Sequence, residues 1–271
     1  MKFSIITINY NNKEGLRKTI ESVVNQTFDD YEYIVIDGGS TDGSIDIIKK
    51  YSEKISYWVS EHDKGIYNAM NKGITHAHGE YLNFMNSGDC FHSPDVLEEI
   101  CPQLHADIVV GAWIKGNNKE AWYFPYTDAT LFHLYKWTFN HQSSFFKHHL
   151  FKNDLYREDL KIVSDWAFYF QKLIIENCSF QSLITCIADF DDTGVSCTHG
   201  EQGWAERKQV LRETLPRRLR DDYEYIGHLE HEFWDTIAIL PDNPKVQHLI
   251  CKIIKISTPI ITKLLKIIHK Y

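Results

Sequence analysis

The 271-residue sequence lacks any run of 18 uninterrupted apolar residues, so it offers no candidate for a membrane-spanning helix. Glycine and proline are scarce, at 14 and 7 residues, which excludes collagen-like and low-complexity chains. Aromatic residues make up 14% of the chain, and this content excludes a disordered protein. The apolar run at the N-terminus is too short for a signal peptide. The length and composition therefore predict one large globular domain, alone or with an appendage.

The six cysteines contain no C-x-x-C pair, which makes a zinc site improbable. Without a signal peptide, we expect them to be reduced thiols in a cytoplasmic protein.

Charge is unevenly distributed. The net charge of −8 argues against a nucleic-acid-binding protein. From Asn243 onward there are six lysines and no acidic residue, so residues 1–242 carry −14. Segment 245–271 combines these lysines with many Ile and Leu residues and is interrupted by Pro259. Two interpretations remain open: a peripheral contact with an anionic membrane, at its inner face, or a helix that packs on the domain or on a second subunit of a homodimer.

Apolar runs and helical spacings alternate along the first 111 residues. Strands are predicted at 3–8, 33–36, 55–59, 81–85 and 108–111, and helices near 16–24, 44–51 and 66–77. Ser93 and Pro94 predict the start of a further helix, with Ser93 as its cap. This alternation predicts a mostly parallel, Rossmann-like sheet that is flanked by helices.

Polar residues follow three of these strands, where ligands bind in such sheets. They are Asn9 and Tyr10, then Asp37 with two glycines, then the 86–89 segment that ends in Asp89. Neither a P-loop nor a G-x-G-x-x-G motif is present, so the common nucleotide-binding motifs are excluded. Taken alone, each polar segment is better explained as a turn or a helix cap.

The second part of the chain is less regular. Residues 112–139 are rich in aromatic side chains, which suit either sugar stacking or core packing. Ser164 and Asp165 open a predicted helix that runs to about residue 177, and residues 201–240 are expected to be helical and charged.

The combination of segments is much more specific than its parts. In chain order they are N-Y-N at 9–11, D-G-G-S-T-D-G at 37–43, E-H-D-K-G-I-Y-N-A-M-N-K-G at 61–73, G-E-Y at 79–81, N-S-G-D at 86–89, H-Q-S at 141–143 and S-D-W at 164–166. This pattern resembles the family 2 glycosyltransferases, which have the GT-A fold. The resemblance covers 1–200, with a nucleotide-sugar half at about 1–111 and an acceptor half at about 112–200. It leaves 201–271 as a helical C-terminal region with the basic tail.

The resemblance implies roles for particular residues. It implies that Asp165 is the catalytic base of an inverting transfer and that Asp89 binds a divalent cation, Mn²⁺ or Mg²⁺. The family usually has two adjacent acids at the metal site, whereas this chain has Gly88 before Asp89. The residues implied to bind the nucleotide sugar are Asn9, Tyr10, Asp37, Gly39, Ser40, Asp63, Lys64, Gly65 and Asn68.

We therefore expect transfer of a sugar from a nucleotide-diphosphate donor, with UDP as the expected nucleotide, to a hydroxyl of a glycan or lipid-linked acceptor. Bacterial surface polysaccharide synthesis is the expected setting. Two alternatives from other classes are a sugar nucleotidyltransferase and a non-catalytic carbohydrate-binding protein. The first normally has a glycine-rich basic loop after the first strand, which residues 9–13 do not form, and the second does not explain the carboxylates at the strand ends.

Overall fold

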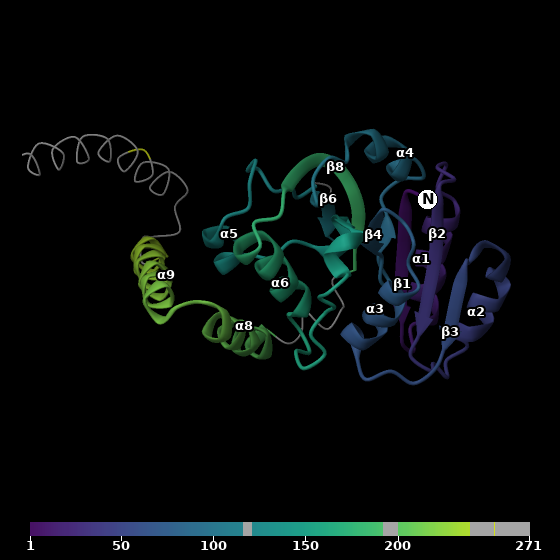
Figure 1. The fold of residues 1–271 in the computed structure, drawn as a ribbon, viewed down its shortest axis with the longest axis horizontal. Helices are drawn as coiled ribbons and strands as arrows, with labels where there is room; N and C mark the ends of the chain where they lie inside the picture. The colour runs from purple at the N-terminus through teal and green to yellow at the C-terminus, as the bar shows by residue number, and fades with distance from the viewer. Residues whose placement is uncertain (116–120, 192–199, 239–251, 253–271) are drawn as a thin grey trace, which may run out of the picture. The chain divides into compact units, whose positions relative to one another are not determined.

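The computed structural model describes residues 1–115, 121–191, 200–238 and 252 (Figure 1). The chain divides into two compact units, Met1–Glu213 and Thr214–Tyr271. The first unit contains an eight-stranded sheet in the order β3-β2-β1-β4-β7-β6-β8-β5.

The N-terminal half of the sheet is parallel. It consists of β1 (Phe3–Asn9), β2 (Tyr31–Asp37), β3 (Tyr57–Ser60) and β4 (Tyr81–Phe84), and these strands alternate with α1 (Lys13–Val24), α2 (Ser44–Lys50) and α3 (Ile66–Thr75). In this region the predicted strands and helices are confirmed, with shifts of a few residues at their ends. Because parallel strands end at the same edge, Asn9 and Asp37 are register partners.

Helices cover both faces of this half, which explains why β1 and β2 are buried along nearly their whole length. All seven residues of β1 are buried. Phe3 and Ile5 pack in one core cluster with Leu16 and Ile20 of α1. On α3, a Cβ at Gly73 would lie 2.5 Å from the side chain of Ile6, so only glycine allows α3 to approach β1 this closely.

The second half of the sheet is mixed. Strand β7 (Ser144–Lys147) is antiparallel to both β4 and β6 (Ile108–Lys115), whereas β8 (Phe180–Phe190) is parallel to β6. The short strand β5 (Cys90–Phe91) pairs with the end of β8, with Cys90 opposite Asp189. This pairing brings the chain after β8 next to the loop that precedes β5.

One predicted helix start is wrong, and one predicted helix changes type along its length. Helix α4 (Val96–Ile100) begins after Asp95, and the Ser93 hydroxyl bonds to the Asp95 carboxylate instead of capping the helix. Gln26 accepts the N–H of Leu97 in its place, at 3.1 Å. The predicted helix at 164–177 begins as α6 (Ser164–Tyr169) but continues as a π-helical segment, Phe170–Ile175.

Three further α-helices lie in the described ranges: α5 (Leu131–Lys136), α8 (Gly200–Thr214) and α9 (Arg217–Ala238). Of these, α8 and α9 agree with the helical character predicted for residues 201–240. The first unit reaches Glu213, and the predicted domain boundary at residue 200 stays a prediction. Among the described helices, none has the length and hydropathy needed to cross a membrane. Apart from Lys252, the basic tail at 245–271 lies outside the described residues.

Candidate active site

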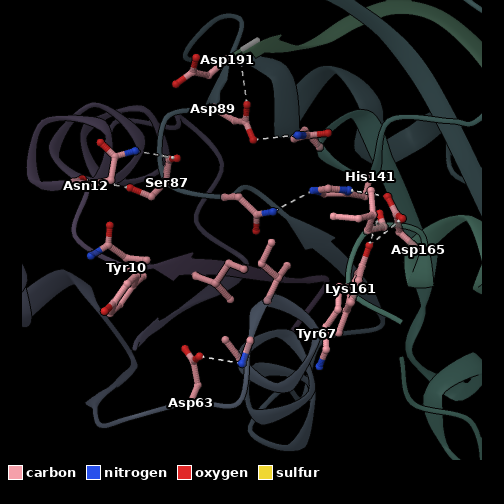
Figure 2. A pocket seen from close by; sticks show the side chains of 18 of the residues that line it. Tyr10, Asn12, Asp63, Tyr67, Ser87, Asp89, His141, Lys161, Asp165 and Asp191 are labelled. Atoms are coloured by element: carbon pink, nitrogen blue, oxygen red, sulfur yellow. Dashed lines mark hydrogen bonds and ion pairs between the residues drawn. The ribbon is translucent and has the colours of Figure 1, made fainter. Parts of the chain in front are cut away.

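A cavity of about 440 Å³ opens at the carboxyl ends of β1 and β4, where we predicted the polar cluster. In Figure 2, Tyr10 and Asp63 lie on one part of its wall, Asp89 and Asp191 on another, and His141 and Asp165 beside them. Segments far apart in the sequence therefore converge on one space, as the sequence interpretation requires.

Asp89 lies in the loop between β4 and β5. Its Oδ1 accepts the backbone N–H of Asp191 at 2.8 Å, and its Oδ2 accepts the side-chain amide of Gln142 at 2.8 Å. The hydroxyl of Thr19 donates to the Asp89 carbonyl at 2.6 Å, which ties the loop to α1. Burial raises the pKa of Asp89 to about 6, and the two hydrogen bonds oppose this only in part. A cation beside the carboxylate would favour its ionised form.

Asp165 lies in the first turn of α6, where a negative charge is favoured. Its Oδ1 accepts the Tyr67 hydroxyl at 3.0 Å and the Trp166 N–H at 2.9 Å, and its Oδ2 accepts a bond from His141 at 3.1 Å. Burial alone would raise the pKa of Asp165. The hydrogen bond from His141 and the charge interaction with it, followed by the bonds from Trp166 and Tyr67, outweigh burial and hold this pKa below its ordinary value. The carboxylate is therefore ionised, which is the form that accepts a proton.

His141 connects two walls of the cavity. The side-chain amide of Asn86 lies 2.9 Å from Nε2, and Nδ1 faces the Asp165 carboxylate. When the ring is neutral, the amide nitrogen of Asn86 donates to Nε2, and Nδ1 then carries the proton toward Asp165. The two contacts hold the imidazole between the loop after β4 and the start of α6.

Glu206 of α8 supports the wall that precedes Asp165. Its carboxylate accepts backbone N–H groups of Lys161 at 3.0 Å, Ile162 at 2.9 Å and Val163 at 3.2 Å. Lys161 and Ile162 line the cavity. The carboxylate therefore satisfies three donors of a segment that is not in a regular element.

We expect Glu206→Ala to lower the free energy of unfolding by about 2–3 kcal/mol, because hydrogen bonds to a charged acceptor are lost and buried donors stay unpaired. Urea unfolding followed by circular dichroism measures the change. Glu201→Ala is the matched control, since Glu201 is an exposed acid at the start of the same helix. Equal stability of the two variants would contradict the role of Glu206.

Asp37 does not line the cavity, although we expected it to touch the nucleotide. Its Oδ1 accepts Asn9 Nδ2 at 2.7 Å and the Ser40 hydroxyl at 2.6 Å. Its Oδ2 accepts the Ser40 N–H at 2.9 Å and the Ser60 hydroxyl at 2.6 Å. These four bonds occupy the acceptor positions of a carboxylate. In this structure Asp37 positions Asn9, which does line the cavity.

The other predicted site residues divide in the same way. The Lys64 N–H donates to Asn68 Oδ1 at 3.1 Å, and Asn68 Nδ2 donates to the Glu158 carboxylate at 3.0 and 3.1 Å. The predicted residues that line the cavity are Asn9, Tyr10, Asp63, Gly65, Asp89 and Asp165, and those that do not are Asp37, Gly39, Ser40, Lys64 and Asn68.

Several lining residues had no predicted role. Tyr67, His141 and Gln142 stand inside the segments that carried the resemblance, so position alone could have marked them. Lys161 and Asp191 lie outside those segments, and only the fold brings them to the cavity. The buried Oδ1 atoms of Asn9 and Asn86 have no hydrogen-bond partner among the described residues.

The chain belongs to the glycosyltransferase family 2. The model of this family, described as Glycosyl transferase family 2, matches residues 4–176. An uncharacterised glycosyltransferase of Mycobacterium tuberculosis is 34% identical over 262 residues, covering 86% of this chain and 95% of the relative. A glycosyltransferase of PGL/p-HBAD biosynthesis from Mycobacterium bovis is 29% identical over 174 residues, covering 61% and 67%.

Solved structures confirm the predicted GT-A fold. S. aureus TarS residues 1–349 in complex with UDP-GlcNAc align with a TM-score of 0.65 at 20% identity, over 82% of this chain and 70% of that one. For the longer TarS structure the alignment spans 42% of that chain. A mannosyltransferase of Pyrobaculum calidifontis in complex with GDP-Man and Mn²⁺ aligns with a TM-score of 0.52 at 16% identity, over 69% and 56%.

Proposed function

We propose that this glycosyltransferase transfers a sugar, with inversion, from a UDP-sugar to a hydroxyl of a bacterial surface glycan or its lipid-linked precursor. The observation that carries the proposal is that Asp89 and Asp165 line one cavity at the strand ends. The TarS complex with UDP-GlcNAc supports the choice of nucleotide, and the relative from PGL/p-HBAD biosynthesis supports the glycan setting.

Tyr10 and Asp63 suit the nucleotide base. Tyr10 is 66% exposed at the end of β1, which leaves its ring available for stacking. Asp63 Oδ1 accepts the Gly65 N–H at 2.9 Å, whereas Oδ2 lies 2.5 Å from the point where a Cβ of Gly38 would be. The bare glycine thus makes room for a carboxylate beside the ring. A uracil that stacks on Tyr10 can donate its imide N–H to Asp63.

We expect Tyr10→Ala to weaken UDP binding roughly 5- to 150-fold, because stacking of a base on an aromatic ring contributes about 1–3 kcal/mol. Isothermal titration of UDP gives the Kd. Tyr225→Ala is the control, since Tyr225 is 64% exposed on α9. Equal UDP affinity of the two variants would show that the base does not stack on Tyr10.

The sugar and its diphosphate belong at the end of the cavity that holds Asp89 and Asp165. Breaking the sugar–phosphate bond creates positive charge on the ring and negative charge on the leaving UDP. The Asp165 carboxylate takes the proton from the acceptor hydroxyl as that oxygen attacks the anomeric carbon, on the face opposite to UDP. A single displacement of this kind inverts the anomeric centre.

The residues present fit a divalent cation. No group of three or more His, Cys, Asp or Glu side chains with metal-binding geometry occurs within the described ranges. Mg²⁺ and Mn²⁺ nevertheless bind at sites with one or two carboxylates when phosphate oxygens and water complete the shell. Asp89 is such a carboxylate, and a bound cation would neutralise the charge that develops on the diphosphate.

A second cavity, of about 340 Å³, suits the acceptor. It shares His141 and Asp165 with the first cavity, so a hydroxyl placed there reaches the base. Three tryptophans line it: Trp166 is buried, whereas Trp137 and Trp204 have exposed fractions of 51% and 55%. Exposed indole rings are suitable surfaces for sugar faces. Within the aromatic 112–139 region, Trp137 would therefore bind sugar, whereas Phe139 packs in the core.

Incubation with a panel of UDP-sugars and Mn²⁺ tests the function. Release of UDP, first by slow hydrolysis and then with an added glycan acceptor, is the expected result. Release of pyrophosphate would instead indicate a nucleotidyltransferase, and no turnover with any donor a binding protein. The anomeric configuration of the product, read by NMR, decides between inversion and retention.

A further inference from the structure

The space above Gly88 is occupied by a carboxylate from elsewhere in the chain. Gly88 has φ +112°, and a Cβ built on it would lie 2.6 Å from Asp191 Oδ2 and 3.3 Å from Asp191 Cγ. The carboxylate of Asp191 therefore lies where a side chain at position 88 would begin. Any residue larger than glycine at position 88 would clash with the Asp191 carboxylate, so Asp191 could not keep its present position.

The fold explains how Asp191 reaches this space. Strand β5 follows Asp89 directly and pairs with the end of β8, so the residue after Phe190 meets the loop before β5. The Asp191 N–H then donates to Asp89 Oδ1. In Figure 2 the two aspartates lie together, on a different part of the cavity wall from Tyr10 and Asp63. Both line the cavity.

We propose that Asp191 is the second protein ligand of the divalent cation, and that it replaces the acid that family members have at position 88. The proposal rests on the proposed function, because the diphosphate of the donor must supply further ligands. A second carboxylate brings the protein charge at the cation to −2. Two carboxylates also match the number that Mg²⁺ and Mn²⁺ usually take from a protein when phosphate oxygens supply further ligands.

The backbone and the side chain of Asp191 have separable tasks. The N–H orients Asp89 and is present in any substituted residue except proline, whereas only the carboxylate can bind the cation. Asp191→Asn retains the N–H and the size of the side chain and removes its charge. The variant therefore tests metal binding and not the position of Asp89.

The experiment is a titration of Mn²⁺, with and without UDP, followed by the electron paramagnetic resonance signal of free Mn²⁺. Wild type, Asp191→Asn and Asp89→Asn are compared. Asp189→Asn is the control, because Asp189 is two residues away and pairs with His92 at 2.8 Å. We expect Asp191→Asn to raise the Kd for Mn²⁺ in the presence of UDP at least tenfold, as an order of magnitude. Asp89→Asn should do the same and Asp189→Asn should not.

The outcomes separate the two proposals. If wild type binds no Mn²⁺ in the presence of UDP, the metal-dependent function is wrong. If wild type binds Mn²⁺ and Asp191→Asn binds it equally well, only the role of Asp191 is overturned. Should Asp191→Asn not fold, Asp191→Glu and Asp191→Gln form a second pair that differs in charge and not in shape. Tighter Mn²⁺ binding by the Glu variant supports the proposal, and equal Kd values for this pair overturn it.

Discussion

Asp165→Asn is expected to lower kcat for sugar transfer by about 10²–10⁴-fold, because an amide cannot take the proton of the acceptor hydroxyl. UDP affinity should not change, since the expected base contacts, Tyr10 and Asp63, lie on another part of the cavity wall. The amide oxygen of Asn can still accept the Tyr67 hydroxyl and the Trp166 N–H, so the start of α6 is expected to persist. Steady-state release of UDP and calorimetric titration of UDP measure the two effects.

Asp159→Asn is the matched control for this variant. Asp159 is an exposed acid in the same segment and bonds to Arg157 outside the cavity. It should retain wild-type kcat. A turnover near wild type for Asp165→Asn would remove Asp165 as the base. Parallel losses of kcat and UDP affinity would mean that Asp165 shapes the cavity instead of accepting a proton.

The local part of the fold follows from the sequence. Strands such as Phe3–Asn9 are rich in apolar residues because both of their faces are buried, and α3 repeats its apolar residues at helical spacing. The polar residues after these strands share one edge because parallel strands end together. This is why Asn9 and Asp89 were expected in one site, and both line the cavity.

The rest depends on pairings that no local pattern encodes. Asp191 reaches Gly88 only because β5 pairs with the end of β8, which lies about a hundred residues later. Asp37 belongs to the D-G-G-S-T-D-G motif, but the motif does not show whether its carboxylate is free to bind a ligand. In the fold the hydroxyls of Ser40 and Ser60 donate to it. The Ser93 cap was wrong for a similar reason, since the hydroxyl found a nearer partner in Asp95.

A second large effect is expected for Asp89→Asn, which should inactivate the enzyme and yet stabilise the protein without metal. The pKa of Asp89 is raised to about 6 in the fold, against about 3.9 in an unfolded chain. The folded state therefore binds a proton more tightly, so this group costs stability as the pH rises from about 4 to 6. Above that range the full cost is about 3 kcal/mol as an order of magnitude.

The Asn variant removes this cost, so its free energy of unfolding at pH 7.5, measured in a chelator, should exceed that of wild type by about 1–3 kcal/mol. Asn can accept the Asp191 N–H, and its amide can donate to Gln142 once the Gln142 amide is reversed. The gain should shrink as the pH is lowered from about 6 to about 4, because the wild-type carboxyl in the folded state is then protonated and no longer a buried charge. Transfer activity should fall by more than roughly 100-fold, since loss of a direct metal ligand costs at least as much as loss of a residue that supports one.

Higher stability together with full activity would show that the charge of Asp89 is not used in the reaction. Lower stability at all pH values would show that the carboxylate is held by attraction that outweighs its burial.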